Sequence, residues 1–145
     1  NKAPFVKLLS DRCMQKANSE GVIRTKLGRK CRFDMWEPKD FGVHTPEKFE
    51  NASAKYGSSN IKRAFTYKAL NRLIQGSAAD QTKAAIVACH ENGFTPLLQI
   101  HDELCFNLQD KSQIEKIKTV MEGCMKLKVP SVVDVAVGDD FGMAT

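Results

Sequence analysis

Two neighbouring carboxylates stand between two short, largely apolar runs of the chain. His101, Asp102 and Glu103 follow residues 97–100 and precede residues 104–108, a pattern typical of a β-hairpin. Adjacent carboxylates at a turn between strands are costly to bury unless they are paired or bind a metal ion. The placement therefore predicts a functional role for this turn.

A second candidate site is a polar stripe on the longest expected helix. Lys68, Asn71, Arg72 and Gln75 follow the spacing that places side chains on one helix face. Amide side chains suit the N3 and O2 acceptors that every base pair presents in the minor groove. The next residue, Gly76, costs a helix roughly 1 kcal/mol relative to Ala, which close approach of another backbone or ordinary helix-to-sheet packing would offset.

The densest positive charge is expected on a β-hairpin near the start of the chain. Residues 21–26 and 29–34 have strand character and flank Leu27 and Gly28, which suit a tight turn. The basic side chains of this hairpin are those of Arg24, Lys26, Arg29, Lys30 and Arg32. They suit a polyanionic partner, with a merely solvated basic hairpin as the alternative.

The elements that must position these residues follow from periodicity and turn residues. The expected order is helix, hairpin, connector, long helix, hairpin, helix and strand. We expect a first helix at residues 4–19, a hairpin at 21–34 and a connector at 36–60 that contains a short helix at 46–56. A long helix then runs from 60 to about 90, followed by a hairpin at 95–108, a helix from 112 to about 126 and a strand at 132–137. Asn60 is expected to cap the long helix, and Asn92 and Gly93 to end it. An antiparallel sheet with helices packed on one face fits this order and indicates the α+β class.

Composition limits the class of protein. The 145 residues carry a net charge of +5, which favours a polyanionic partner such as nucleic acid. The 5 cysteines form no C-x-x-C pair and are typical of reduced thiols in a cytoplasmic setting. No apolar run approaches the roughly twenty residues of a membrane span and no signal-peptide pattern is present, so neither membrane insertion nor secretion is expected. The first residue is Asn1 and not Met, so we expect a fragment, a processed product or one part of a split protein.

Two motifs resemble those of family A DNA polymerases, the DNA polymerase I class. They are NRLIQGSAAD at residues 71–80 and QIHDEL at residues 99–104, in the order and at the distance found in the family. The segment AFTYKAL at residues 64–70 is most similar to bacteriophage members. The segment at residues 21–29 resembles the stretch that follows the nucleotide-binding fingers helix, so the resemblance covers nearly the whole chain.

The resemblance implies roles for the residues of both candidate sites. Asp102 matches the palm aspartate that binds catalytic Mg²⁺, and Glu103 matches the supporting carboxylate beside it. His101 matches the residue that faces the primer terminus. Asn71 and Gln75 match helix positions that contact template and primer in the minor groove.

Further DNA contacts are expected from basic residues on the helix and on the hairpin. These are Lys68, Arg72, Arg24, Lys26 and Arg29. The family often has a basic residue eight positions before the glutamine, where this chain has Tyr67 followed by Lys68.

The resemblance also implies a fold and a set of partners. Residues 1–60 would form the C-terminal part of the fingers and a connector, and residues 61–145 a palm portion with its catalytic hairpin packed against a long helix. The partners would be primer-template DNA, dNTPs and Mg²⁺ in a two-metal site. The family's second metal-binding aspartate and its fingers helix are not recognisable here, and Asp139 and Asp140 are expected in an exposed turn. We therefore expect a chain that is inactive alone and needs an upstream segment or a separate polymerase subunit.

Two other classes of function remain open. A metal-dependent phosphohydrolase could use His101 and Asp102 as adjacent ligands, but such sites need more histidines and the others are only His44 and His90. A non-catalytic nucleic-acid-binding module would explain the positive charge. It would not explain the paired acids, which repel phosphate unless a cation intervenes.

Overall fold

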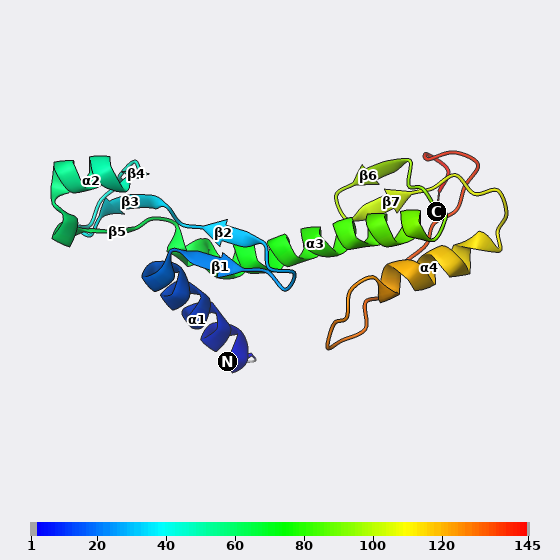
Figure 1. Ribbon diagram of the computed structural model, residues 1–145, viewed down its shortest axis with the longest axis horizontal. Coiled ribbons are helices and arrows are strands. Elements are labelled where there is room, and N and C mark those ends of the chain that lie inside the picture. Colours follow the sequence, from blue (N-terminus) through cyan, green and yellow to red (C-terminus); the bar gives the residue numbers. More distant parts are fainter. Residues whose placement is uncertain (1–2, 145) are drawn as a thin grey trace. The chain divides into compact units, whose positions relative to one another are not determined.

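The fold combines helices with small antiparallel sheets, as an α+β chain should. The computed structural model describes residues 3–144, in which we find four α-helices and three separate sheets (Figure 1). These residues form two compact units, the first ending at Ser77 and the second beginning at Ala78. The expected α+β class and antiparallel pairing are confirmed, and the strands form three small sheets instead of one continuous sheet. No helix in the described part of the chain is both long and apolar enough to cross a membrane.

The first helix of unit one, α1, spans Pro4–Glu20 and confirms the helix predicted at residues 4–19. Proline suits the first helical turn because it has no amide hydrogen to satisfy. Gly21 ends the helix with a φ of 68°, and its amide donates a hydrogen bond to the Ala17 carbonyl over 3.0 Å. This is the left-handed end that glycine adopts without a steric penalty.

The predicted basic hairpin is confirmed. Strands β1 (Val22–Arg24) and β2 (Lys30–Arg32) pair antiparallel, with Val22 opposite Arg32. The amide of Gly28 donates to the Thr25 carbonyl over 3.0 Å, and Gly28 has a φ of 89°. Glycine supplies the positive φ that closes the turn.

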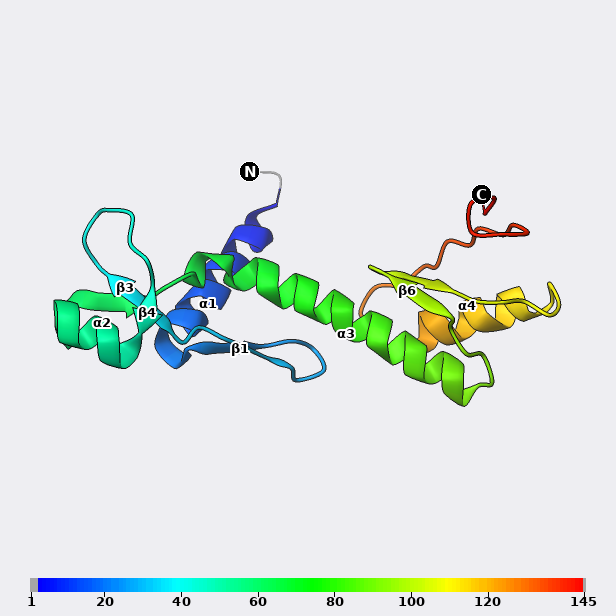
Figure 2. The ribbon, with the colours of Figure 1, turned by 90° about the horizontal axis from the view of Figure 1, so that it is seen from above.

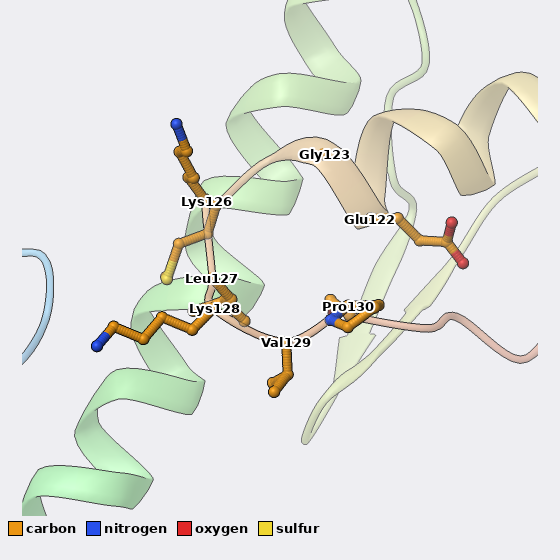
Figure 3. Close-up of a pocket in the computed structure, with 9 residues that line it drawn as sticks. Glu122, Gly123, Lys126, Leu127, Lys128, Val129 and Pro130 are labelled. Atoms are coloured by element: carbon orange, nitrogen blue, oxygen red, sulfur yellow. The ribbon is translucent and has the colours of Figure 1, made fainter.

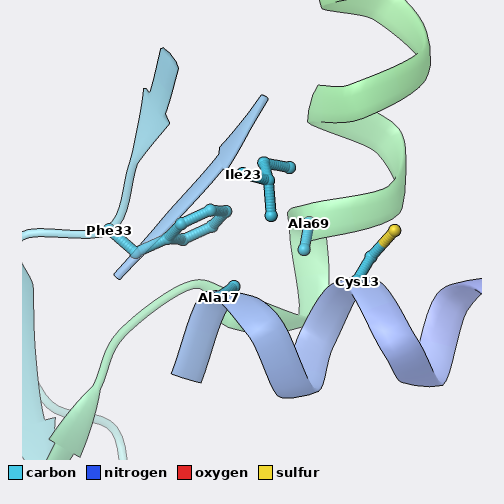
Figure 4. Close-up of a cluster of buried hydrophobic side chains, with 5 residues drawn as sticks. All are labelled: Cys13, Ala17, Ile23, Phe33 and Ala69. Atoms are coloured by element: carbon cyan, nitrogen blue, oxygen red, sulfur yellow. The ribbon is translucent and has the colours of Figure 1, made fainter. Parts of the chain in front are cut away.

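A small apolar core joins α1, the hairpin and the start of the long helix. Its buried members are Cys13, Ala17, Ile23, Phe33 and Ala69 (Figure 4). Cys31, Leu70 and Leu73 pack against it from partly buried positions. Small residues on the helices let Phe33 fill the space between them, which fixes the hairpin within this unit.

The segment at residues 36–60, predicted as a connector with a short helix at 46–56, contains that helix and also short strands that the sequence did not predict. Strands β3 (Met35–Pro38), β4 (Glu47–Lys48) and β5 (Ile61–Arg63) form an antiparallel sheet in the order β4-β3-β5. Helix α2 (Phe49–Tyr56) lies beside this sheet (Figure 2). The centres of the Trp36 and Phe49 rings lie 5.0 Å apart, and the rings pack edge to face. Strands of two to four residues are too short to show a period in the sequence.

The long helix begins later than predicted. After β5 and a short 3-10 turn at Thr66–Lys68, helix α3 spans Ala69–Glu91. Asn60 is not its N-cap. The side-chain amide of Asn60 donates to the Tyr56 carbonyl over 3.0 Å, and the residues that follow Asn60 pair with β3. The predicted end is confirmed by Gly93, whose φ is 84°.

Unit two contains the rest of α3, a second hairpin and helix α4. Strands β6 (Leu98–Ile100) and β7 (Glu103–Cys105) pair antiparallel, and α4 spans Gln113–Gly123, so both predicted elements are confirmed. Both ribbon views place α4 alongside this part of α3 (Figures 1 and 2). The Cys124 thiol lies 3.7 Å from the Gln81 carbonyl oxygen.

The predicted strand at residues 132–137 is wrong. This segment has no strand pairing in the structure, although Val132, Val135 and Val137 are exposed β-branched residues. Its backbone is held by the Val133 amide, which donates to Glu122 Oε1 over 3.0 Å. Strand propensity produces a strand only where a neighbouring strand supplies hydrogen bonds.

Candidate functional site

The carboxylate pair lies at the tip of the β6–β7 hairpin. Ile100 pairs with Glu103, so His101 and Asp102 are the two turn residues between the strands. His101 has a φ of 51°, in the left-handed region that most side chains avoid. The Gln99 side-chain amide donates to the His101 carbonyl over 3.0 Å and steadies the turn. Strained backbone of this kind is often found at functional sites.

The side chains of the turn are open to solvent. His101, Asp102 and Glu103 are all exposed, so the carboxylates are not directed into an apolar interior. Carboxylate oxygens are hard ligands that suit Mg²⁺, which usually keeps several waters and takes only one or two protein carboxylates together with substrate phosphate. The described residues contain no group of three or more His, Cys, Asp or Glu side chains close enough to hold a metal. Because Mg²⁺ takes only one or two protein carboxylates, this exposed pair fits part of its coordination shell and does not form a complete site by itself.

The amide stripe lies on the surface of unit one, at the start of α3. Asn71 and Gln75 are exposed and one helical turn apart, so both amides are available to the same partner. Lys68 is also exposed, at the end of the 3-10 turn. Its ammonium lies 5.2 Å from the centre of the Phe65 ring and 5.5 Å from that of Tyr67.

Arg72 differs from the other members of the stripe. Its side chain is half-buried, with the guanidinium carbon 4.9 Å from the centre of the Phe33 ring. Arg72 Nη1 donates to the Arg32 carbonyl over 3.2 Å. Arg72 therefore contacts the basic hairpin through its guanidinium group.

The hairpin presents its predicted basic residues on the surface. Arg24, Lys26 and Arg29 are exposed, and Arg24 Nη1 donates to the Gly28 carbonyl over 3.3 Å. The hairpin packs closely on α3 at Gly76. A Cβ atom at Gly76 would lie 2.9 Å from Thr25 Cγ2 and 3.7 Å from Cys31 Sγ. Close packing of hairpin on helix therefore accounts for a glycine in the middle of α3.

Arg63 was not recognised from the sequence. Its Nη1 donates to the Phe33 carbonyl over 2.9 Å, and its guanidinium carbon lies 4.6 Å from the centre of the Trp36 ring. A Cβ atom at Gly21 would lie 2.5 Å from the same guanidinium carbon, so a side chain there would displace the end of Arg63, and the φ of 68° at this position also favours glycine. The partners of Arg63 are distant in sequence, and no local pattern could have indicated them.

Asp110, Cys89 and Cys124 have their interactions within unit two. Asp110 accepts hydrogen bonds from the Ser112 amide over 3.1 Å and from the Ser112 hydroxyl over 2.8 Å, just before α4. The backbone hydrogen bond from Ser112, with help from its hydroxyl, lowers the pKa of Asp110. Burial raises the pKa of the Cys89 and Cys124 thiols, so these cysteines stay protonated.

Unit two also has an open hollow, of about 580 Å³, where α4 ends and the chain turns (Figure 3). Glu122, Lys126, Lys128 and Pro130 are among its lining residues. None of the predicted site residues lines it. The hollow is therefore not the candidate site.

Comparison with known proteins gives a consistent result along the chain. The sequence profile described as DNA polymerase family A matches residues 1–143. A DNA-directed DNA polymerase of Pseudomonas phage M6 is 40% identical over 142 residues, which are 98% of this chain and 18% of the phage protein. DNA polymerase I of Pseudomonas aeruginosa is 29% identical over 97% of this chain and 14% of its own length.

A solved structure shows a similar fold. It is described as the POL domain of Pol1 from M. smegmatis in complex with DNA primer-template and dNTP. The TM-score is 0.59 at 27% identity, covering 86% of this chain and 20% of that one. The present chain therefore spans about a fifth or less of the proteins it resembles.

Proposed function

This chain belongs to DNA polymerase family A, and from that premise we propose that it is the C-terminal fingers and palm portion of a DNA-directed DNA polymerase. In this proposal residues 1–60 contribute the last part of the fingers and a connector, and residues 61–145 a palm portion. The observation that carries the proposal is the exposed pair of Asp102, in the turn of a hairpin, and Glu103, at the start of its second strand. This pair lies within a chain that matches the family over residues 1–143.

The carboxylate pair would hold Mg²⁺ for nucleotide addition. When bound, two such ions would activate the primer 3′ oxygen and neutralise charge on the leaving pyrophosphate. Asp102 would be a direct ligand, and Glu103 would support the site from the adjacent strand. His101 would face the primer terminus from the same turn. The two paired strands give the Asp102 carboxylate a rigid support.

The exposed polar residues of unit one would hold the DNA. Asn71 and Gln75 would donate amide hydrogen bonds to the acceptors common to all base pairs in the minor groove, and so sense pair geometry without reading sequence. Basic side chains would contact phosphates, which position a duplex without specifying its bases. These are Lys68, Arg24, Lys26 and Arg29.

The chain would need the remaining polymerase portion for activity. The 18% share of the phage relative supports this, because most of a polymerase of that length lies outside the matched part. We place the second metal-binding aspartate and the nucleotide-binding helix in an upstream segment or in a separate subunit. The partners of the assembled enzyme are primer-template DNA and dNTPs.

Primer extension tests the proposal. The chain is combined with the remaining polymerase portion from the same genome and given a primed template, dNTPs and Mg²⁺. Asp102→Asn should lower extension by about a thousandfold, since a lost metal ligand removes several kcal/mol of charge stabilisation. Asp139→Asn is the control, because it removes an exposed carboxylate in the same unit. Extension by the chain alone would contradict the partner requirement, and full activity of Asp102→Asn would contradict the metal role.

A further inference from the structure

We propose that Arg72 and Arg63 are positioning residues, which fix the basic hairpin on the helix that carries Asn71 and Gln75. The two guanidinium groups donate hydrogen bonds to successive backbone carbonyls at the end of β2, those of Arg32 and Phe33. We call this pair of arginine contacts the clamp. The consequence for DNA rests on the proposed function, whereas the clamp itself does not. Arg72 would then act on DNA only through the hairpin.

The first half of the clamp comes from α3. Arg72 donates to the Arg32 carbonyl over 3.2 Å and lies 4.9 Å from the centre of the Phe33 ring. The Cys31 thiol lies 4.0 Å from the carbonyl oxygen of Arg72. Three consecutive residues at the end of β2 therefore contact one residue of the helix. A donor occupied in this way is poorly placed to bind phosphate.

The second half comes from β5. Arg63 donates to the Phe33 carbonyl over 2.9 Å and packs on Trp36 at 4.6 Å. The Phe33 amide donates to the Gly21 carbonyl over 2.8 Å, which ties this point to the start of β1. Hydrogen bonds from a charged donor are stronger than neutral ones, and a planar guanidinium also stacks on an aromatic face.

The turn end of the hairpin is held by close packing. A Cβ atom at Gly76 would lie 2.9 Å from Thr25 Cγ2, and Thr25 is only 5% exposed. A two-stranded hairpin is marginally stable by itself. Fixed at both ends, it holds the exposed residues Arg24, Lys26 and Arg29 at a constant distance from the amide pair on α3.

Hydrogen exchange of the complete chain without DNA tests the clamp. In Arg72→Ala, the amides of β1 and β2 should exchange about tenfold faster, the effect of losing one hydrogen bond from a charged donor. Amides of α4, in the other unit, should keep their rates. Arg12→Ala, which removes the same charge from an exposed position on α1, is the matched control and should leave the hairpin unchanged.

Milder variants keep this test decisive if Arg72→Ala loosens the whole unit. Arg72→Lys and Arg63→Lys keep the charge but lose the planar stacking, so each should give a smaller increase confined to the hairpin. Unchanged exchange of the hairpin in both Arg72 variants would overturn the clamp.

Binding to primer-template DNA separates positioning from contact. The triple variant Arg24→Ala, Lys26→Ala, Arg29→Ala is compared with and without Arg72→Ala over a range of salt concentrations. Positioning predicts that Arg72→Ala weakens binding about tenfold in the wild-type background and has no further effect in the triple variant. An additive loss, with the salt slope reduced by about 0.9, would show that Arg72 contacts phosphate directly and would overturn its positioning role.

The two proposals can fail separately. If the wild-type chain, alone and with the remaining polymerase portion, does not bind primer-template DNA, the proposed function is contradicted. The exchange measurement needs no DNA and still decides whether the arginines hold the hairpin.

Discussion

The two units position their candidate functional residues in different ways. In unit one, residues far apart in sequence hold the basic hairpin on α3: arginine–carbonyl hydrogen bonds, aromatic stacking and a core around Phe33. In unit two, Asp102 lies in a two-residue turn and Glu103 begins the next strand, and this turn is held by its own strands and by the Gln99 side-chain amide. Residues proposed to hold DNA thus depend on tertiary packing, and residues proposed for chemistry depend on local backbone geometry. Substitutions in the two units should have correspondingly different effects on stability.

The largest effect on stability is expected from Phe33→Ala. Phe33 is 2% exposed and lies in the core of unit one, so its removal should lower the free energy of unfolding by about 3–5 kcal/mol. Phe41→Ala is the matched control, because Phe41 is fully exposed and its loss should cost less than about 0.5 kcal/mol. Urea denaturation of both variants measures the difference. Equal losses in the free energy of unfolding of the two variants would contradict the packing of Phe33 in the core of unit one.

Gly76→Ala should have the next largest effect. Alanine improves helix propensity by up to about 1 kcal/mol, but the added methyl collides with Thr25 and overpacking costs about 1–3 kcal/mol. The expected result is a net loss of about 1 kcal/mol in thermal unfolding. Gly123→Ala, at the end of α4 with open space around it, should be neutral or stabilising. A stabilising Gly76→Ala would show that the hairpin does not approach α3 closely.

His101→Gly should change stability by less than about 1 kcal/mol, because the strain of a positive φ is relieved while the unfolded chain gains entropy. Primer extension by the assembled polymerase should nevertheless fall, since the variant loses the imidazole that we propose faces the primer terminus. Retained extension would argue against a role for this side chain.

The smallest effect is a pH dependence at the start of α4. The pKa of Asp110 is lowered in the folded chain by the Ser112 hydrogen bonds, so the stability it contributes is fully present above the unfolded pKa of about 3.9. That contribution is lost as pH falls through the lower folded value. Asp110→Asn should remove this part of the acid dependence of α4, as followed by amide exchange. An unchanged pH profile in the variant would contradict the contribution of Asp110.

Local features could be predicted from the sequence. Helices α1 and α4 and both hairpins follow from apolar spacing, Pro4, Gly21 and Gly28, because these signals act over a few residues. The carboxylate turn was predictable for the same reason.

Long-range features could not be predicted. The sheet formed by β3, β4 and β5 depends on pairing between short strands, and Asn60 binds backward to Tyr56 instead of forward to a helix. The packing of Arg72 on Phe33 replaces an expected position on an open stripe, because tertiary contacts decide which polar side chains of a helix stay free. Val132 and its neighbours have strand propensity without a pairing strand in the structure.

The central claim, that Asp102 holds a divalent ion in the assembled polymerase, can be tested with Mn²⁺ in place of Mg²⁺. Paramagnetic relaxation of the backbone amides is measured in the complex with primer-template and dNTP. We expect strong, selective relaxation at residues 101–103 that disappears in Asp102→Asn and persists in Asp139→Asn. The account would be contradicted if residues 101–103 of the wild type showed no such relaxation, or if the relaxation persisted in Asp102→Asn.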